Sequence, residues 1–139
     1  MTYNPFYEIA KRFFSSRESV RQPVPNVSED DVRRIVQRDF PPEQIDPAMS
    51  VLREYGVKKC EGEHARVYLA ALKLANGSLE KLKREIEAAN RDFRDIIAAA
   101  EYPRYFRAAS MVSMNGASRR EKERIIAEDW QQYECWLRR

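Results

Sequence analysis

Histidine and cysteine, two residue types common in metal sites and covalent catalysis, are nearly missing from this chain. His64 is the only histidine among 139 residues, and Cys60 and Cys135 are the only cysteines. A structural zinc site needs four ligands that are mostly Cys or His. A nucleophile–base pair at Cys60 and His64 lacks a third group to orient it. The sequence therefore predicts no metal, no cofactor and no catalytic residue.

Glycine is also scarce, and long apolar runs are missing. The four glycines are isolated, so the chain has no glycine-rich phosphate-binding loop. No apolar run approaches the length of a transmembrane helix. The N-terminal MTYNPFYEIAKRFF is interrupted by charges, unlike a secretory signal. We therefore expect a cytoplasmic protein with two reduced cysteines, and a Cys60–Cys135 disulfide is the less favoured alternative.

A strong excess of one charge sign is missing as well. The 25 basic and 22 acidic residues leave a net charge of +3. Residues 104–139 hold eight basic and five acidic residues, so only the C-terminal part leans basic. Such a mixed charge does not favour nucleic acid as a partner. The apolar content of 43% is sufficient for a core, which excludes global disorder.

What the chain does contain is a series of helix start signals. At Asn4 and at Asp46, an N-cap residue is followed by a proline suited to the first helical position. Ser28 and Ser118 each stand three residues before an acidic residue, as in a capping box. These four signals predict four helix starts.

The clearest periodicity lies in the middle of the chain. Apolar residues from Leu79 to Ala100 recur at alternating spacings of three and four. This a/d pattern predicts one long central helix over about 78–102, which Pro103 would end.

Other elements are shorter or less clearly bounded. A stripe of apolar residues predicts a long C-terminal helix over about 119–138. The segment 63–75 is apolar on two sides, which is typical of a central helix, and Asn76-Gly77 predicts a tight corner after it. Residues 104–117 give no clear signal.

Together these signals predict an all-α fold, an irregular bundle of five or six helices in a single domain spanning residues 1–139. Residues 1–26 are expected to form a helical arm followed by a proline-containing connector. Packing of the arm on its own domain is the favoured interpretation. A partner, a second copy and a membrane surface are the alternatives.

Paired carboxylates occur at Asp92 with Asp95 and at Glu128 with Asp129. Acid–base catalysis needs two carboxyl groups in unequal environments. These pairs stand among Arg and Lys residues, so we interpret them as a salt-bridged exterior.

Two segments combine aromatic and basic residues, the arm and the corner after Glu101. Aromatic residues alternating with arginines over 102–107 are typical of single-strand nucleic-acid binders. The same aromatic residues would also suit the closed end of a helical bundle. The candidate partner surface consists of Phe6, Ile9, Phe13, Phe14, Arg104, Tyr105, Phe106 and Arg107.

Several segments resemble a group of small, all-helical bacterial hypothetical proteins. They are VYLAALKL (67–74), NGSLEKL (76–82), AAAEYP (98–103) and DWQQYECWL (129–137). The resemblance covers about residues 45–139. It implies a bacterial, cytosolic, helical protein, and because the group has no assigned activity it transfers no functional residues.

The sequence thus favours a non-enzymatic protein that binds another protein or itself. The first alternative is a nucleic-acid-associated protein that uses the basic region 102–124. The second is an enzyme whose site is assembled from residues dispersed along the chain.

Overall fold

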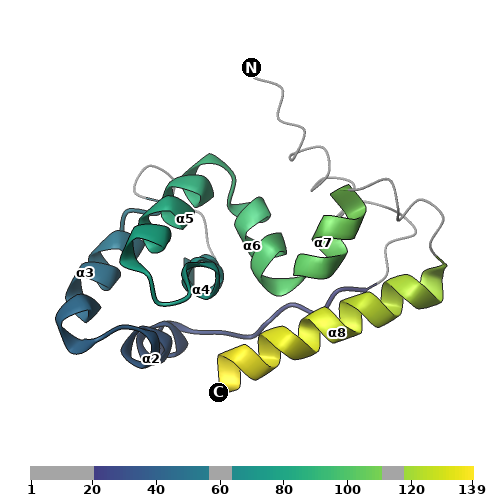
Figure 1. Ribbon diagram of the computed structural model, residues 1–139, viewed down its shortest axis with the longest axis horizontal. Helices are drawn as coiled ribbons and strands as arrows, with labels where there is room; N and C mark the ends of the chain where they lie inside the picture. The colour runs from purple at the N-terminus through teal and green to yellow at the C-terminus, as the bar shows by residue number, and fades with distance from the viewer. Residues whose placement is uncertain (1–20, 57–63, 111–117) are drawn as a thin grey trace.

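The computed structural model describes residues 21–56, 64–110 and 118–139, and every regular element in these ranges is a helix. This confirms the predicted all-α bundle. The helices, labelled as in Figure 1, are α2 (Glu29–Asp39), α3 (Pro42–Leu52), α4 (His64–Ala75), α5 (Leu79–Arg91), α6 (Phe93–Glu101), α7 (Pro103–Ser110) and α8 (Arg119–Arg138).

Helix α4 lies at the centre of the bundle, as its two-sided apolar pattern predicts. It packs against α2, α5 and α6, and Figure 1 shows it nearly end-on between them. Half of its residues are buried, namely Val67, Leu69, Ala70, Ala71, Leu72 and Ala75. Small alanines on this helix let the neighbouring helices approach closely, while the leucines fill the core.

Helix α2 begins at the predicted capping box, in which the Ser28 amide donates to the Asp31 carboxylate at 3.0 Å. The predicted start of the next helix at Asp46 is wrong, because α3 begins at Pro42. Pro42 takes the first helical position, where proline costs no hydrogen bond. Pro47 lies inside α3, where its missing amide leaves one carbonyl of the first turn without a helical partner.

The Asn76-Gly77 corner between α4 and α5 is confirmed. Both residues have positive φ, 50° for Asn76 and 80° for Gly77. Ser78 then caps α5, since its hydroxyl accepts from the Lys81 amide at 3.3 Å. A Cβ on Gly77 would lie 3.0 Å from the carbonyl oxygen of Asp39, so the corner needs glycine.

The predicted single helix over 78–102 is wrong, because it is divided into α5 and α6 at Asp92. Asp92 has an extended backbone (φ −157°, ψ 103°), and its carboxylate accepts from the Arg94 amide at 3.1 Å. Asp92 therefore ends one helix and caps the next. The apolar spacing runs through the break because both halves bury their stripes against α4.

Helix α7 fills part of the segment 104–117, in which no clear signal is present in the sequence. It starts at Pro103, the same residue that was predicted to end the preceding helix. Residues 111–117 lie outside the described ranges. The described ranges alone hold seven helices, more than the predicted five or six, because of α7 and the break at Asp92.

Helix α8 has the predicted bounds and the predicted cap, since the Ser118 hydroxyl accepts from the Glu121 amide at 3.2 Å. It runs along the bundle past α7 and α6, and its C-terminal end reaches α2 (Figure 1). There Arg34 and Arg38 donate to the carbonyl oxygens of Leu137 (2.6 Å) and Trp136 (2.7 Å). These arginines satisfy carbonyls that the end of a helix leaves without partners.

The connector before α2 is extended, as predicted, over its described residues 21–28. The Tyr102 hydroxyl donates to the Pro23 carbonyl, Pro25 is buried, and Val27 packs against the main core. The arm predicted in residues 1–26 lies outside the described ranges up to residue 20. No helix in the described ranges is long and apolar enough to cross a membrane.

Candidate functional site

Two features of the molecule combine residues that could carry a function. One is a buried polar cluster between α4, α6 and α8, and the other is the surface at the end of the bundle formed by α7 and α8. The polar cluster consists of Arg66, Lys73, Glu101, Asp129 and Tyr133.

An ion pair between Arg66 and Glu101 links α4 to α6. The guanidinium donates to both carboxylate oxygens of Glu101, each at 2.8 Å. The side chain of Glu101 is fully buried and that of Arg66 is 15% exposed. A paired geometry of this kind compensates the cost of placing a carboxylate in the core.

Asp129 of α8 is fully buried and joins α8 to α7. One of its carboxylate oxygens accepts from the Tyr105 amide at 2.8 Å, in the first turn of α7. Burial raises the pKa of Asp129, while the amides of Tyr105 and Arg104 and the charges of Arg104 and Lys73 act in the opposite direction. Burial lowers the pKa of Lys73, with Asp129 opposing that shift.

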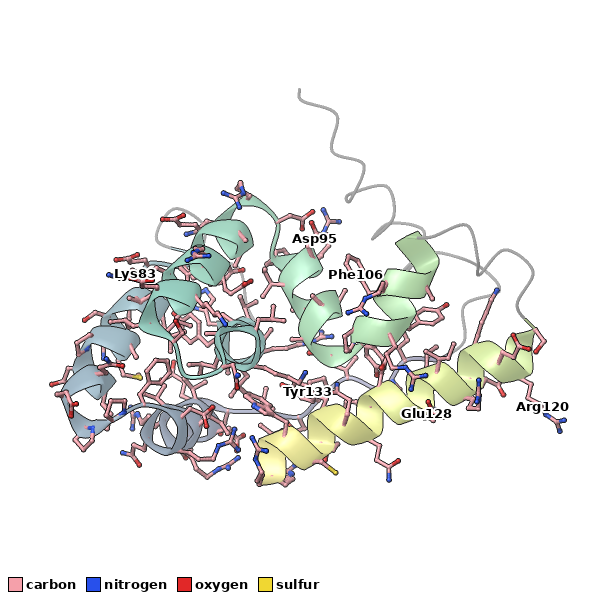
Figure 2. The ribbon with its side chains drawn as sticks, viewed as in Figure 1. Lys83, Asp95, Phe106, Arg120, Glu128 and Tyr133 are labelled. Carbon is pink, nitrogen blue, oxygen red and sulfur yellow. The ribbon has the colours of Figure 1, made fainter. Side chains whose placement is uncertain are left out.

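Tyr133 lies one helical turn after Asp129 and points from α8 toward α4 and α6 (Figure 2). Its ring is fully buried, and within the described ranges its hydroxyl has no hydrogen-bond partner. Burial is the main cause that raises the pKa of Tyr133, and Glu101 adds to the shift. The hydroxyl therefore stays protonated at neutral pH.

The polar cluster is best explained as structural. Glu101, Asp129 and Tyr133 are each fully buried, so a dissolved substrate does not reach them in this conformation. Their described contacts connect helices: Arg66 with Glu101, and Asp129 with the start of α7. Buried polar groups of this kind fix which helices pack together.

Sequence reasoning missed this cluster. Asp129 was interpreted as part of a salt-bridged exterior, and this interpretation is wrong because Asp129 is fully buried. Asp92 is also not a free exterior carboxylate, since it caps α6. The signal that would have found Asp129 is its spacing, three residues after Ile126 and four before Tyr133, on the apolar face of α8.

The candidate residues 104–107 divide between surface and core. Arg104 and Arg107 are exposed, and Phe106 is half-buried. Tyr105 is only 8% exposed and belongs to a small apolar cluster with Tyr102 and Ile126. Because Tyr105 is buried, it does not belong to the candidate surface. Its ring instead helps to close the end of the bundle.

Apolar side chains remain partly exposed above this small cluster. Phe106 and Ile125 are half-buried against it, and Figure 2 shows Phe106 on the side of α7 that faces α6. Val24 is 60% exposed and is the one large apolar side chain classed as exposed in the described ranges. It follows Pro23, which Tyr102 holds by a hydrogen bond, so it belongs to the same end of the molecule.

Exposed arginines lie on α7 and in the first part of α8, at the same end of the molecule. Arg104 pairs with Glu128, and Arg119 pairs with Glu123 at 3.0 Å. Arg120, Lys122 and Arg124 form no ion pair within the described residues. We define the α7–α8 surface by the residues Val24, Arg104, Phe106, Arg107, Arg120, Arg124 and Ile125.

The other predicted residues lie elsewhere or outside the described ranges. Phe6, Ile9, Phe13 and Phe14 fall in residues 1–20, and Cys60 falls in 57–63, so none of them is described. The His64 ring lies edge-on to Tyr55 (5.5 Å between ring centroids) and tilted against Tyr68 (5.9 Å). Cys135 is an exposed free thiol. The described residues contain no group of three His, Cys, Asp or Glu side chains placed to bind a metal ion.

Comparison with models of protein families, with curated proteins and with solved structures found no match.

Proposed function

We propose that this chain is a non-enzymatic protein that acts by binding another protein through the α7–α8 surface. The observation that carries the proposal is the combination of partly exposed apolar side chains with exposed arginines at one end of the molecule. Val24 is 60% exposed, and Phe106 and Ile125 are half-buried. Arginine is enriched in protein interfaces, and apolar side chains supply their buried centre.

The rest of the described surface supports this choice by contrast. The outward face of α5 carries alternating acidic and basic side chains, such as Glu80, Lys83 and Glu87, and no large apolar group. A solvated face of this kind offers little area for a stable contact. Val24, the one large apolar side chain classed as exposed in the described ranges, lies instead at the end of the molecule where a partner would bury it.

Comparative capture from a host extract tests the proposal. Three tagged baits are compared by quantitative mass spectrometry: the wild-type chain, a surface variant Val24→Asp/Arg107→Glu, and a control Lys83→Glu. Figure 2 places Lys83 on α5, at the opposite end of the molecule from the start of α8. We expect a protein that the wild-type chain and the control enrich equally and that the surface variant loses.

Equal enrichment by all three baits would contradict the proposal. Circular dichroism and thermal melting of each bait verify that the substitutions leave the fold intact. Light scattering coupled to size exclusion, with and without residues 1–20, separates a second copy from a different partner. A dimer that the surface variant abolishes would identify the partner as the chain itself.

A further inference from the structure

The buried apolar side chains of the described residues form two separate clusters. The main core takes its members from α2 to α6 and from the C-terminal half of α8. The second cluster is small and consists of Tyr102, Tyr105 and Ile126, at the end of the molecule that holds α7. Trp130 of α8 packs against both clusters. The part of the fold around α7 is therefore a satellite of the main core, and such small clusters can open while the core remains intact.

Helix α7 depends on its neighbours for stability. Its eight residues make about two turns, well below the length at which an isolated helix persists in water. It packs against α6 and α8, and Figure 1 shows it at the end of the bundle next to both. Loss of these contacts would leave α7 without the packing that keeps it in place.

The junction between α6 and α7 has the properties of a hinge. Tyr102 separates the two helices with a non-helical backbone (φ −132°, ψ 58°), and Pro103 then begins α7. The end of α6 is held by contacts that do not involve α7. The Tyr102 hydroxyl donates to the Pro23 carbonyl, and the Gln132 side chain donates to the Ala100 carbonyl at 3.4 Å. Backbone rotation at Tyr102 would therefore move α7 and leave α6 in place.

Asp129 holds the start of α7 against α8, but at a cost. Its Oδ2 accepts from the Tyr105 amide at 2.8 Å. Its Oδ1 is buried and has no hydrogen-bond partner among the described residues. A buried polar oxygen without a partner is destabilising by the free energy of its lost hydration. Opening of α7 would give water access to both oxygens and would remove this cost.

The titratable side chains around Asp129 come from α4, the end of α6, α7 and α8. They are Lys73, Arg66, Glu101, Tyr102, Arg104 and Tyr133. Burial raises the pKa of both tyrosines, so their hydroxyls are neutral at physiological pH. Glu101 pairs with Arg66, and Arg104 pairs with Glu128. Lys73 is thus the cation near Asp129 that forms no ion pair within the described residues.

These surroundings make the closed position of α7 sensitive to protonation. Burial raises the pKa of Asp129 despite the opposing charges of Arg104 and Lys73. In an open state the carboxyl group would be hydrated, and its pKa would return to the ordinary value of about 3.9. Closing therefore favours proton binding, and opening becomes more favourable as pH rises from the ordinary value through the raised one.

We propose that α7 opens as a unit, by backbone rotation at Tyr102, while the other helices stay folded, and that Asp129 is the residue that holds it closed. Opening uncovers Tyr105 and Ile126, which are 8% and 3% exposed in the closed form. Elements that move during binding are drawn from the least stable part of a fold. The inference goes beyond the proposed function, because it does not depend on which surface a partner uses.

Native-state hydrogen exchange of the full chain, followed by mass spectrometry, tests the proposal. The protection of amides in α7 is compared with that in α4, after correction for the intrinsic exchange rate at each pH. We expect α7 to be at least about tenfold less protected than α4. The protection of α7 should change little at low urea concentrations, because a local opening exposes little surface, whereas that of α4 should fall steeply with urea.

The role of Asp129 is tested by the pH dependence of the same exchange. In the wild-type chain the protection of α7 should fall as pH rises above about 3.9 and through the raised folded value. Asp129→Asn should lose this dependence, because an amide side chain does not titrate. The matched control Glu128→Gln changes the neighbouring carboxylate, which pairs with Arg104 on the surface, and should retain the dependence.

Two results would overturn the proposal. Equal protection of α7 and α4, with the same dependence on urea, would show that α7 opens only when the whole chain unfolds. An unchanged pH dependence in Asp129→Asn would show that a different group holds α7 closed. The comparison of α7 with α4 uses the wild-type chain, so it decides whether α7 opens separately even if Asp129→Asn fails to fold.

Discussion

Asp129 combines complete burial with an ionisable group and a hydrogen bond to another helix. Its carboxylate is fully buried, and it accepts from the first turn of α7 through the Tyr105 amide. It thus acts as a cap supplied by a different helix, and α7 depends on α8 for the satisfaction of its own end.

Replacing Asp129 by Ala should lower the free energy of unfolding by about 1–2 kcal/mol, because the Tyr105 amide loses its acceptor. Asp129→Asn keeps an acceptor oxygen and should cost less. Urea unfolding followed by circular dichroism measures both. The control is Glu128→Ala, whose ion pair with Arg104 is largely solvent-exposed, so that its loss should cost less than about 1 kcal/mol. Equal losses for Asp129→Ala and Glu128→Ala would contradict this role.

The same carboxyl group should make stability depend on pH. Burial raises the pKa of Asp129, so the folded chain holds the proton more tightly than the unfolded chain. The carboxyl group of Asp129 therefore makes its full contribution to the free energy of unfolding at pH values below the pKa of an unfolded aspartate, about 3.9. This contribution is lost as pH rises through the raised pKa of the folded state. The difference in unfolding free energy between wild type and Asp129→Asn should therefore fall as pH rises above the unfolded value of about 3.9 and through the raised folded value. A difference that rises over this range would show that the folded state favours the charged form.

Gly77 gives a second prediction for a single residue. Gly77→Ala should lower the free energy of unfolding by about 1–2 kcal/mol, because alanine disfavours positive φ. The new Cβ would also press on the carbonyl of Asp39. Asn76→Gly, at the neighbouring position of positive φ, should be nearly neutral. Thermal melting measures the stability of each variant relative to wild type. A Gly77→Ala variant as stable as wild type would disprove the close approach of residue 77 to the Asp39 carbonyl.

Among the elements, the break between α5 and α6 has the largest effect on the architecture. Helix α5 packs against α3 and α4, whereas α6 packs against α4, α7 and α8. A continuous helix would run straight on from α5. The change of direction at Asp92 brings Glu101 into reach of Arg66 and lets α7 fold back along α8.

Asp92→Ala should lower the free energy of unfolding by about 1 kcal/mol, because the Arg94 amide loses its cap. Asp92→Asn should retain most of the stability, since asparagine caps almost as well. Arg91→Ala, an exposed neighbour in the last turn of α5, serves as the control and should change little. A gain in stability for Asp92→Ala would indicate that the break is imposed by packing alone.

The starts of α2, α5 and α8 were readable from the sequence, whereas those of α3, α6 and α7 were not. Ser28 and Ser118 cap their helices where the sequence placed them, because a cap is a local interaction. Asp92 was missed because the apolar spacing continues across it. Its own signal was local as well: an N-cap aspartate directly before Phe93, with Asp95 three residues later.

At the scale of the whole molecule, the ion pair of Arg66 with Glu101 joins the central helix α4 to α6, and its removal measures how much it contributes to stability. Glu101→Ala breaks this largely buried ion pair and should cost about 3–5 kcal/mol. The double variant Arg66→Met/Glu101→Leu should recover most of that loss, because it removes both charges. Urea unfolding of the single and double variants gives the comparison. A double variant as unstable as Glu101→Ala would show that the pair contributes net stability.

The sequence by itself determined the helical class, most helix ends and the two-sided burial of α4, because these follow from spacing and from contacts within a few residues. The tertiary structure decided which polar residues face the core. Asp129 looked like an exterior carboxylate, and Tyr105 suited either a partner surface or the closed end of the bundle, until the packing of α7 on α8 buried both. The same packing left Phe106 and Ile125 half-buried. Burial of this kind depends on contacts between segments far apart in the chain, and local pattern does not encode them.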